Sequence, residues 1–187
     1  LIFGEIVDAT ILTTNQIIER AKEYKKDGAN IIDLGCMPDT KFDHLEDTVQ
    51  KLKTEGFKVS IDSADDQELL RGGKAGADYL LSISERNSYI ADEVDSIPIL
   101  IPSKPGDMKS LESLISKFIS TKKDFFADPI LDPIHYGFLD SIDRFRKLRN
   151  KFPDINILMG IGNLTELTDS DSSGVNAILM GLVSELN

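Results

Sequence analysis

The sequence has one cysteine, no tryptophan, and no apolar run that approaches the roughly 20 residues needed to span a bilayer. A lone thiol, Cys36, cannot form an intrachain disulfide, which is typical of proteins in the reducing cytoplasm. No segment with the pattern of a signal peptide opens the chain. These absences predict a soluble, cytoplasmic protein and argue against a disulfide-stabilised secreted domain.

Basic residues are scarce. The chain has 21 Lys and Arg against 32 Asp and Glu, which gives a formal net charge of −11 at pH 7. Such a field repels the phosphates of nucleic acids and of anionic membranes. We therefore expect a small molecule, not a nucleic acid or a membrane, as the main ligand.

Glycine (13) and proline (7) are present in ordinary numbers, and 41% of the 187 residues are hydrophobic. This composition excludes disordered and collagen-like chains and is enough for one sizeable core. The first residue is Leu1 and the last residues, Ser184–Asn187, follow an apolar run. We expect residues 1–187 to form one domain of a longer protein.

Short apolar runs alternate with amphipathic stretches along the chain. The runs predict parallel strands that are buried on both faces. The amphipathic stretches predict helices with polar caps and glycine stops. The eight predicted strands are Ile2–Val7, Asn30–Leu34, Lys58–Ile61, Asp78–Ile83, Ile97–Ile101, Asp124–Ala127, Asn156–Met159 and Asn176–Met180.

This eightfold alternation predicts an α/β fold of the (β/α)8 TIM-barrel type, with a weak helix near Glu166–Asp171 and a truncated eighth helix. An open doubly wound sheet is the alternative. The glycine-rich phosphate motif that such sheets often carry after the first strand is absent, which favours the barrel.

Polar residues stand where the predicted strands end, and barrel enzymes place their active sites at this rim. Glu5 and Asp33 lie within the first two strands, and Asp62 follows the third. Asp8, Asp128 and Asn163 follow the first, sixth and seventh strands.

Structural alternatives stay open for several of these residues. Asp62 is a candidate cap for the helix that follows it. Glu5 can point outward from an edge, and Asp33 can make a structural hydrogen bond across the barrel mouth. Asn163 can cap a short helix near Thr165, and Cys36 is more typical of a packed core residue than of a nucleophile.

A rim with several acceptors and few bases selects a ligand with several N–H donors. The 2-amino group and N3–H of a pterin can form a forked pair with a carboxylate. Asn163 can both donate and accept at a ring nitrogen or carbonyl. A Mg²⁺ site built from Asp8, Asp33 and Asp128 is a weaker alternative, because no spacing signature supports it.

Four segments resemble, in order, motifs of the dihydropteroate-synthase-like, pterin-binding family. They match its second, third and sixth strands and its approach to the fourth. These segments are Gly28–Gly35, Val59–Ser63, Gly76–Asp78 and Asp128–Pro133. The resemblance extends over essentially the whole chain and implies a barrel that binds a reduced pterin of the folate or methanopterin type.

The resemblance also separates two branches of this family. Dihydropteroate synthases carry a lysine at strand 7, an Asn-x-Thr at strand 1 and a basic pair at strand 8. This chain has Asn163, Val7–Thr10 and Leu179–Gly181 at those places. Its Gly4-Glu5 and Gly162-Asn163 pairs are instead similar to the methyltetrahydrofolate methyltransferase branch.

The resemblance implies three functions. The first is a transferase that joins a reduced pterin to an arylamine, and the second moves a methyl group from a methylated tetrahydropterin to a corrinoid or thiol acceptor. The third is a non-catalytic pterin-binding scaffold. In each, Asp62, Asp128 and Asn163 would contact the ring, with Glu5, Asp8, Asp33 and Asp132 in the same site. A corrinoid protein or a second copy of the chain is a possible partner.

Overall fold

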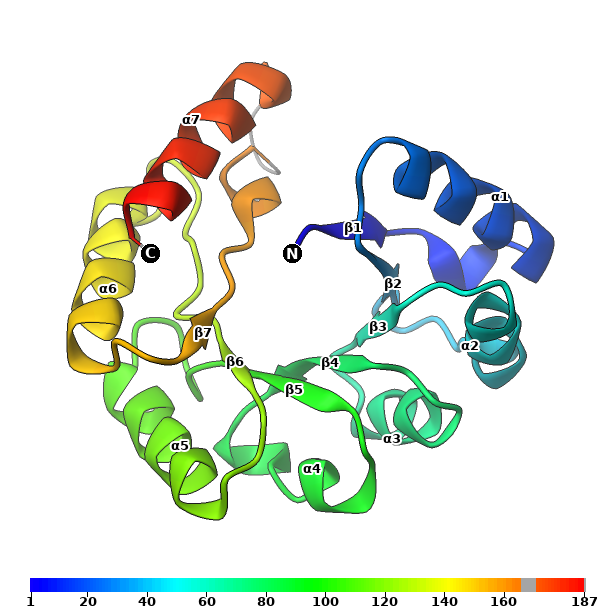
Figure 1. Cartoon of the computed structure of the whole chain (residues 1–187), viewed down its shortest axis with the longest axis horizontal. Coiled ribbons are helices and arrows are strands. Elements are labelled where there is room, and N and C mark those ends of the chain that lie inside the picture. Colours follow the sequence, from blue (N-terminus) through cyan, green and yellow to red (C-terminus); the bar gives the residue numbers. More distant parts are fainter. Residues whose placement is uncertain (166–170, 187) are drawn as a thin grey trace. The chain divides into compact units, whose positions relative to one another are not determined.

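A computed structural model describes residues 1–165 and 171–186. The chain divides into two compact units, Leu1–Ile99 (unit 1) and Leu100–Asn187 (unit 2). Strand order in the sheet follows the chain from β1 to β7 (Figure 1). Each strand is followed by helical structure, which confirms the α/β class with parallel strands.

Unit 1 contains four strand–helix repeats, which begin with β1 and end with the short helix α4. Its elements are β1 (Phe3–Ile6), η1 (Ala9–Ile11), α1 (Thr14–Lys26), β2 (Ile31–Gly35), α2 (Leu45–Thr54), β3 (Val59–Asp62), α3 (Asp66–Lys74), β4 (Tyr79–Ile83), η2 (Glu85–Asn87) and α4 (Ile90–Glu93). The strand β5 (Ile97–Leu100) lies at the boundary between the units.

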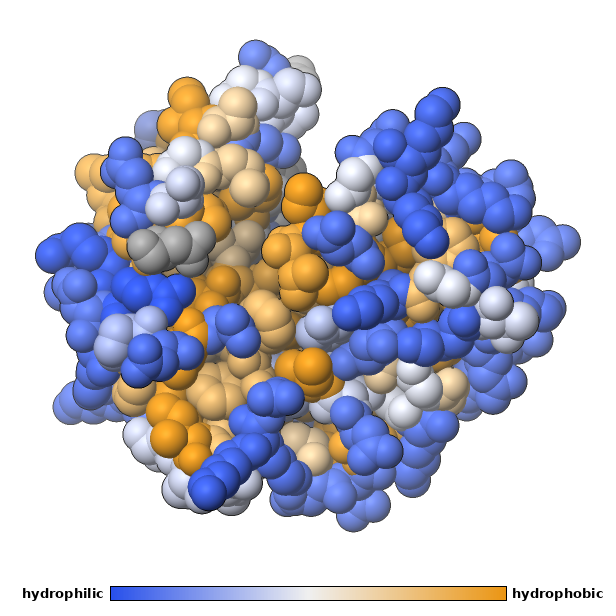
Figure 2. Space-filling model, in the orientation of Figure 1, coloured by the Kyte–Doolittle hydropathy of each residue, from blue (hydrophilic) through white to orange (hydrophobic). Residues whose placement is uncertain are grey.

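One face of the β1–β4 sheet packs against the helices of unit 1. Leu34, Val59 and Ile61 point to this face and are fully buried. A side chain at Gly72 of α3 would lie 2.5 Å from Cγ1 of Ile61, so α3 rests directly on β3. Figure 2 shows hydrophilic side chains over the opposite, outer faces of α1 and α2.

Two helices of unit 1, α1 and α3, begin where a side chain accepts from one of the first backbone N–H groups. Thr13 and Gln16 form a reciprocal capping box at the start of α1. Asp65 accepts from the Gln67 N–H at the start of α3. These caps fix where each helix leaves the carboxyl end of the preceding strand.

Unit 2 has longer helices and shorter strands than unit 1. Its elements are α5 (Met108–Thr121), β6 (Phe126–Ala127), α6 (Phe138–Lys151), β7 (Asn156–Ile157), η3 (Ile161–Leu164) and α7 (Ser172–Glu185). A small core joins the last three helical elements through Phe145, Leu164 and Leu179.

The predicted eighth strand, Asn176–Met180, is wrong, because these residues lie inside α7. Asp171 accepts from the Gly174 N–H and so caps a helix that continues to Glu185. A five-residue apolar run cannot be assigned to a strand or a helix by periodicity alone. The helix predicted at Glu166–Asp171 falls mostly on residues 166–170, which lie outside the described residues.

None of the helices in the described part of the chain is long and apolar enough to cross a membrane.

Candidate functional site

Three carboxylic acids share one face of the unit 1 sheet. Glu5 is paired with Asp33 in the β1–β2 register, and Asp33 is paired with Ser60 of β3. Paired residues on neighbouring parallel strands point to the same face, and so do residues two apart on one strand. Asp62 therefore joins Glu5 and Asp33 on the face opposite the helices. We call these three residues the carboxyl cluster.

Asp33 is the most buried member of the carboxyl cluster, with 4% of its surface exposed. Its Oδ1 accepts a hydrogen bond from the Ser60 hydroxyl at 2.6 Å, a bond between neighbouring strands and not one across the barrel mouth. Burial, the nearby Asp62 charge and, less strongly, Glu5 raise the pKa of Asp33 to about 8 despite the Ser60 bond. Asp33 is therefore largely protonated at neutral pH.

Asp62 ends β3 and is partly buried. Burial and the Glu5 carboxylate raise the pKa of Asp62 to about 7, so only about half of the molecules carry this charge at neutral pH. The alternative role as a helix cap is wrong, because Asp65 is the N-cap of α3. Asp62 thus changes its charge near physiological pH.

Glu5 reaches across the sheet toward β2. A Cβ atom at Gly35 would lie 2.9 Å from Oε1 of Glu5 and 2.9 Å from Cα of Val7. Only glycine leaves room for this carboxylate and the neighbouring backbone. The side chain therefore turns over the end of β2 at Gly35, although Glu5 as a whole is exposed.

Asp8 has a basic partner of its own. It forms an ion pair with Arg20 of α1, and both side chains are partly exposed. Its predicted contact with a pterin stays a prediction, and a ligand would have to compete with this arginine.

An open cavity of about 1120 Å³ lies in unit 1, and Ser63, the residue after Asp62, is among those that line it. The loop after β2 and the loop after β3 form its walls, from Cys36 to Lys41 and from Ser63 to Glu68. The N–H of Cys36 donates to the Asp62 carbonyl at 2.8 Å, so the cavity begins where the two strands end.

Burial and the neighbouring Glu68 carboxylate raise the pKa of the Cys36 thiol, which stays protonated. This agrees with the packed role considered for Cys36 and not with a nucleophile. Glu68 is itself 8% exposed, and its Oε2 accepts from the Ser63 hydroxyl at 2.6 Å.

Helix α3 clamps the loop after β2 at a single residue, Phe42. Oε1 of Glu68 accepts from the Phe42 N–H at 3.4 Å, and Nη2 of Arg71 donates to the Phe42 carbonyl at 2.9 Å. Arg71 also makes two bonds of 2.6 Å to Glu46 of α2. The Phe42 side chain is fully buried, so this end of the loop is anchored on both sides.

In unit 2, Asp128 follows β6 and shapes its own loop. Its Oδ1 accepts from the Ile130 N–H at 2.7 Å, and its own N–H donates to the Leu100 carbonyl at 2.8 Å. Ile130 has a φ of 66°, a conformation that branched side chains rarely adopt.

Arg144 of α6 holds the loop after β6 in this conformation. Its guanidinium donates to the carbonyls of Pro129 and Ile130, at 3.2 and 2.8 Å, and to Oδ2 of Asp132 at 2.7 Å. Arg144 and Asp132 have only 14% and 21% of their side chains exposed. Asp132 therefore has a structural partner within unit 2.

Asn163 lies inside η3, which ends at Leu164; the helix near Thr165 that it was considered to cap falls mostly on residues 166–170, outside the described residues. Nδ2 of Asn163 donates to the Leu131 carbonyl at 3.3 Å, which ties the loop after β7 to the loop after β6. In unit 2 the structure thus brings Asn163 to the loop that carries Asp128 and Asp132.

Among residues 1–165 and 171–186, no three His, Cys, Asp or Glu side chains are grouped as a metal site requires. The Mg²⁺ alternative therefore gains no support from the positions of Asp8, Asp33 and Asp128.

Four side chains that position the candidate site and its loops are not predicted from the sequence: Ser60, Glu68, Arg71 and Arg144. Ser60 could have been found, because it stands two residues before Asp62 and so shares its face. Glu68 stands three residues after Asp65, which is the spacing of a capping box. That spacing predicts a bond within the helix start and not the observed bond to Phe42. Nothing in the sequence indicates the partners of Arg71 and Arg144.

No family model matches the chain. A curated protein of Methanocaldococcus jannaschii, described as uncharacterized, is 33% identical over 207 aligned residues. The match covers 99% of this chain and 39% of that protein, so the chain spans about two fifths of its curated relative.

Solved structures of dihydropteroate synthases have the same fold over nearly the whole chain. The Yersinia pestis enzyme with a sulfonamide drug has a TM-score of 0.70 at 13% identity, covering 97% of this chain and 82% of its own. The Xanthomonas albilineans enzyme in complex with 7,8-dihydropteroate has 0.69 at 15%, covering 100% and 84%. The Anaplasma phagocytophilum enzyme with bound 6-hydroxymethylpterin-monophosphate has 0.66 at 18%, covering 99% and 88%.

These likenesses confirm the predicted fold class. The chain has the fold of an incomplete (β/α)8 barrel, with seven strands among its described residues.

Proposed function

We propose that this chain is a pterin-binding domain that acts on a reduced pterin of the folate or methanopterin type. One observation carries the proposal: Glu5, Asp33 and Asp62 share one face of a sheet whose fold is that of dihydropteroate synthases. The bound molecules of two of those enzymes, 7,8-dihydropteroate and 6-hydroxymethylpterin-monophosphate, are pterins.

In this proposal the Asp62 carboxylate accepts from the 2-amino group and N3–H of the ring. Such a forked pair is a charge-assisted bond and needs an ionised carboxylate. Asp33 contributes as a largely protonated neighbour that limits the negative charge of the cluster. Asp128 and Asn163 are further proposed ring contacts.

The finer proposal is a transferase, and two reactions remain. The fold supports the reaction that joins a pterin to an arylamine. Asn163 counts against it, because the resemblance places Asn163 where dihydropteroate synthases carry a lysine. Its neutral amide suits methyl transfer from a methylated tetrahydropterin to a corrinoid or thiol, because it can donate or accept at a ring nitrogen. A non-catalytic pterin-binding scaffold is the remaining candidate.

Calorimetry with tetrahydropterin tests the binding proposal. Asp62→Asn removes a charged hydrogen bond, which is worth about 1.5–3 kcal/mol, so Kd should rise about 10- to 100-fold. The exposed Asp27→Asn serves as the control that removes one charge and should leave Kd unchanged.

The pKa of Asp62 gives this test a second, independent readout. A ligand that needs the ionised form binds fully above pH 7 and loses affinity below it, because the proton on Asp62 must first leave. Wild-type Kd should be about tenfold weaker at pH 6 than at pH 8, and Asp62→Asn should abolish this dependence. Equal Kd values for wild type and Asp62→Asn would exclude Asp62 from the site.

Product analysis then separates the reactions. Incubation with a reduced pterin diphosphate and an arylamine, or with a methylated tetrahydropterin and a corrinoid, is followed by mass spectrometry. A new pterin–amine bond or a methylated corrinoid identifies the reaction, and binding without either product identifies the scaffold.

A further inference from the structure

The Asp62 carboxyl group receives no hydrogen bond within the described part of the chain. Two other buried acids of unit 1 are matched, because Asp33 accepts from Ser60 and Glu68 accepts from Ser63. A partly buried carboxylate without such a donor is costly, and in folded proteins it is commonly satisfied by water or by a ligand. The side chains beside Asp62 therefore indicate what a ligand held there would touch.

Leu81 is the neighbour of Asp62 on the same face of the sheet. The β3–β4 register pairs Asp62 with Leu81 and, two residues earlier, Ser60 with Tyr79. Paired residues on neighbouring parallel strands point to the same face, about 4.8 Å apart. The Phe3 ring packs edge-on against Tyr79 with the centroids 5.3 Å apart, so β4 presents these residues on the face of the carboxyl cluster. Leu81 is partly exposed there and can meet a ligand bound at Asp62.

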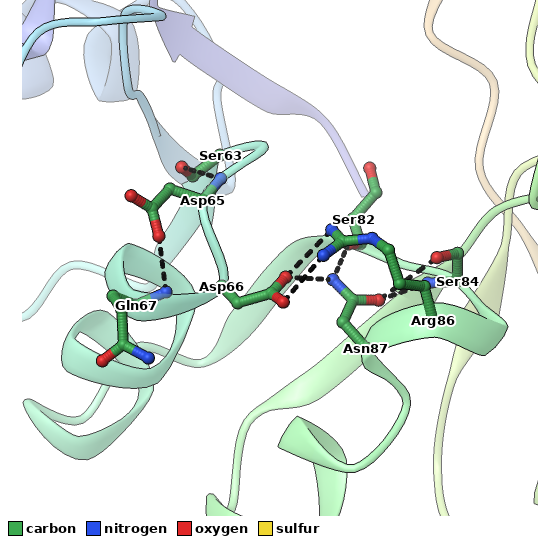
Figure 3. A network of polar contacts seen from close by, with 8 residues as sticks. All are labelled: Ser63, Asp65, Asp66, Gln67, Ser82, Ser84, Arg86 and Asn87. Carbon is green, nitrogen blue, oxygen red and sulfur yellow. Dashed lines mark hydrogen bonds and ion pairs between the residues drawn. The ribbon is translucent and has the colours of Figure 1, made fainter.

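The end of β4 is anchored so that Leu81 stays beside Asp62. The Leu81 carbonyl accepts from the N–H of Ser63, the residue after Asp62, at 2.8 Å. Figure 3 shows how the next residue is held: the Asn87 amide donates to the Ser82 carbonyl at 3.3 Å and to the first residue of α3 at 3.1 Å. Because Asn87 is only 2% exposed, these bonds are shielded from water.

On the other side of Asp62, the same row of the sheet has a glycine and then a second apolar side chain. Gly35 of β2 is paired with Asp62, and a Cβ atom at Gly35 would lie 2.9 Å from Cα of Val7. Val7 follows β1 and is 64% exposed. Oε1 of Glu5, which lies over Gly35, is an acceptor. The row beside Asp62 thus offers apolar surface and acceptors, but no side-chain donor.

A pterin ring carries acceptors on both sides of the donor edge that Asp62 would hold. The C4 oxygen stands next to N3–H, and N1 stands next to the 2-amino group. If the ring plane lay across the strands, one of these acceptors would point at Leu81 and would lose water without gaining a donor. If the ring plane runs along the strands, Leu81 covers one face of the ring, and apolar surface is buried instead. A row without a donor favours the second arrangement.

We propose that Leu81 determines the orientation and the specificity of ring binding, because it covers one face of a ring whose donor edge is held by Asp62. The inference rests on the proposed function and deepens it. It assigns the site to flat heterocycles that present two donors at one edge and need no polar partner from β4. Recognition then depends on these donors and on the face of the ring, and not on contacts to the C4 oxygen or N1.

Methyl NMR tests the orientation directly. The probe is fully oxidised pterin, whose ring current moves the signals of methyl groups upfield over the ring face and downfield at the ring edge. In the wild-type chain, labelled at its leucine methyl groups, the Leu81 signals should move upfield on titration. The signals of Leu114, which is buried in α5 of unit 2, should stay in place. A downfield shift of Leu81, or no shift while the ligand binds, overturns the inference.

Three substitutions of Leu81 give a matched affinity test by calorimetry with tetrahydropterin. Leu81→Ala uncovers part of the ring and should raise Kd about five- to tenfold. Leu81→Met keeps an apolar side chain of similar volume, so its Kd should stay within about threefold of the wild-type value. Leu81→Asn has nearly the shape of leucine but carries a polar amide, and it should weaken binding at least as much as alanine does. The control Ile119→Ala shortens an exposed side chain of α5 and should leave Kd unchanged.

Two calorimetric outcomes overturn the inference while Asp62→Asn still weakens binding. One is tighter binding by Leu81→Asn, because its amide would then donate to a ring edge turned toward β4. The other is an equal Kd for wild type and Leu81→Ala. Thermal melting checks that each variant is folded, and the wild-type methyl shifts decide the orientation if one is not. The proposed function fails separately, and the inference with it, if tetrahydropterin binds wild type and Asp62→Asn equally or not at all.

Discussion

In unit 1 the carboxyl groups of Glu5, Asp33 and Asp62 belong to strand residues, whereas in unit 2 those of Asp128 and Asp132 belong to a loop after a two-residue strand. A ladder of backbone bonds fixes the direction of each strand side chain. The unit 2 loop depends instead on bonds from single side chains, above all from Arg144. The carboxyl groups of unit 1 are therefore held in place by many backbone hydrogen bonds, and those of unit 2 by a few side-chain contacts.

Removal of Arg144 should have the largest effect on the free energy of unfolding, because the loop after β6 depends on its contacts. Arg144→Met leaves Asp132 largely buried without its partner and two carbonyls without a donor, so we expect a loss of about 3–5 kcal/mol in the free energy of unfolding. The matched control is Arg20→Met, which breaks the more exposed pair with Asp8 and should cost about 1 kcal/mol or less. Equal losses in urea denaturation would show that the Arg144 contacts do not hold unit 2.

The buried carboxyl of Asp33 should make the stability of unit 1 depend on pH. Because its folded pKa is raised to about 8, folding favours the protonated form, and stability is lost as pH rises from about 4 through 8. We expect the free energy of unfolding to fall by about 2–4 kcal/mol between pH 5 and pH 9. This range includes the relaxation of the structure around Asp33 and the coupling of Asp33 to Asp62. Asp33→Asn should flatten this profile in chemical denaturation, and an unchanged slope would contradict the assignment.

Gly35→Ala probes the close approach of Glu5 to β2. The new Cβ would lie 2.9 Å from a backbone atom of Val7, which cannot rotate away, so we expect a loss of about 1–3 kcal/mol. Gly181→Ala on α7 is the control, because nothing lies within 4 Å of its Cβ and alanine favours a helix by about 0.5–1 kcal/mol. Thermal melting of the two variants should therefore shift in opposite directions.

Asn163→Ala should have the smallest effect on stability. The variant loses one long hydrogen bond to the Leu131 carbonyl, worth about 1 kcal/mol. If Asn163 also contacts the ring, the variant weakens binding of N5-methylated tetrahydropterin more than that of the unmethylated ring. Equal losses for the two ligands, measured by calorimetry, would leave Asn163 with its structural role alone.

The sequence predicts the seven described strands because each is a short apolar run between turn residues, a signal that does not depend on distant contacts. It fails at α7, where residues 172–184 carry no charge and the helical period is therefore invisible. The exposed Ile178 and Met180 of this helix contradict the buried strand that their hydrophobicity suggests.

The candidate site was predictable only in part, for a physical reason. Glu5, Asp33 and Asp62 follow from strand alternation, since their spacing fixes a common face. The ion pair of Asp8 and the bonds of Arg144 join residues 12 to 15 positions apart through helix packing. Such contacts depend on how a helix returns to its strand, which the residue pattern alone does not specify.

The clamp of α3 on Phe42 bears on how this domain can change during evolution. Glu68 and Arg71 hold the backbone of Phe42, while the N–H of Met37 donates to Thr10 at 3.0 Å. Insertions and deletions after β2 are therefore tolerated only between these anchors, at residues 38–41. That stretch forms one wall of the cavity, so we expect the cavity wall to tolerate changes in these four residues without a change in the contacts that hold the sheet.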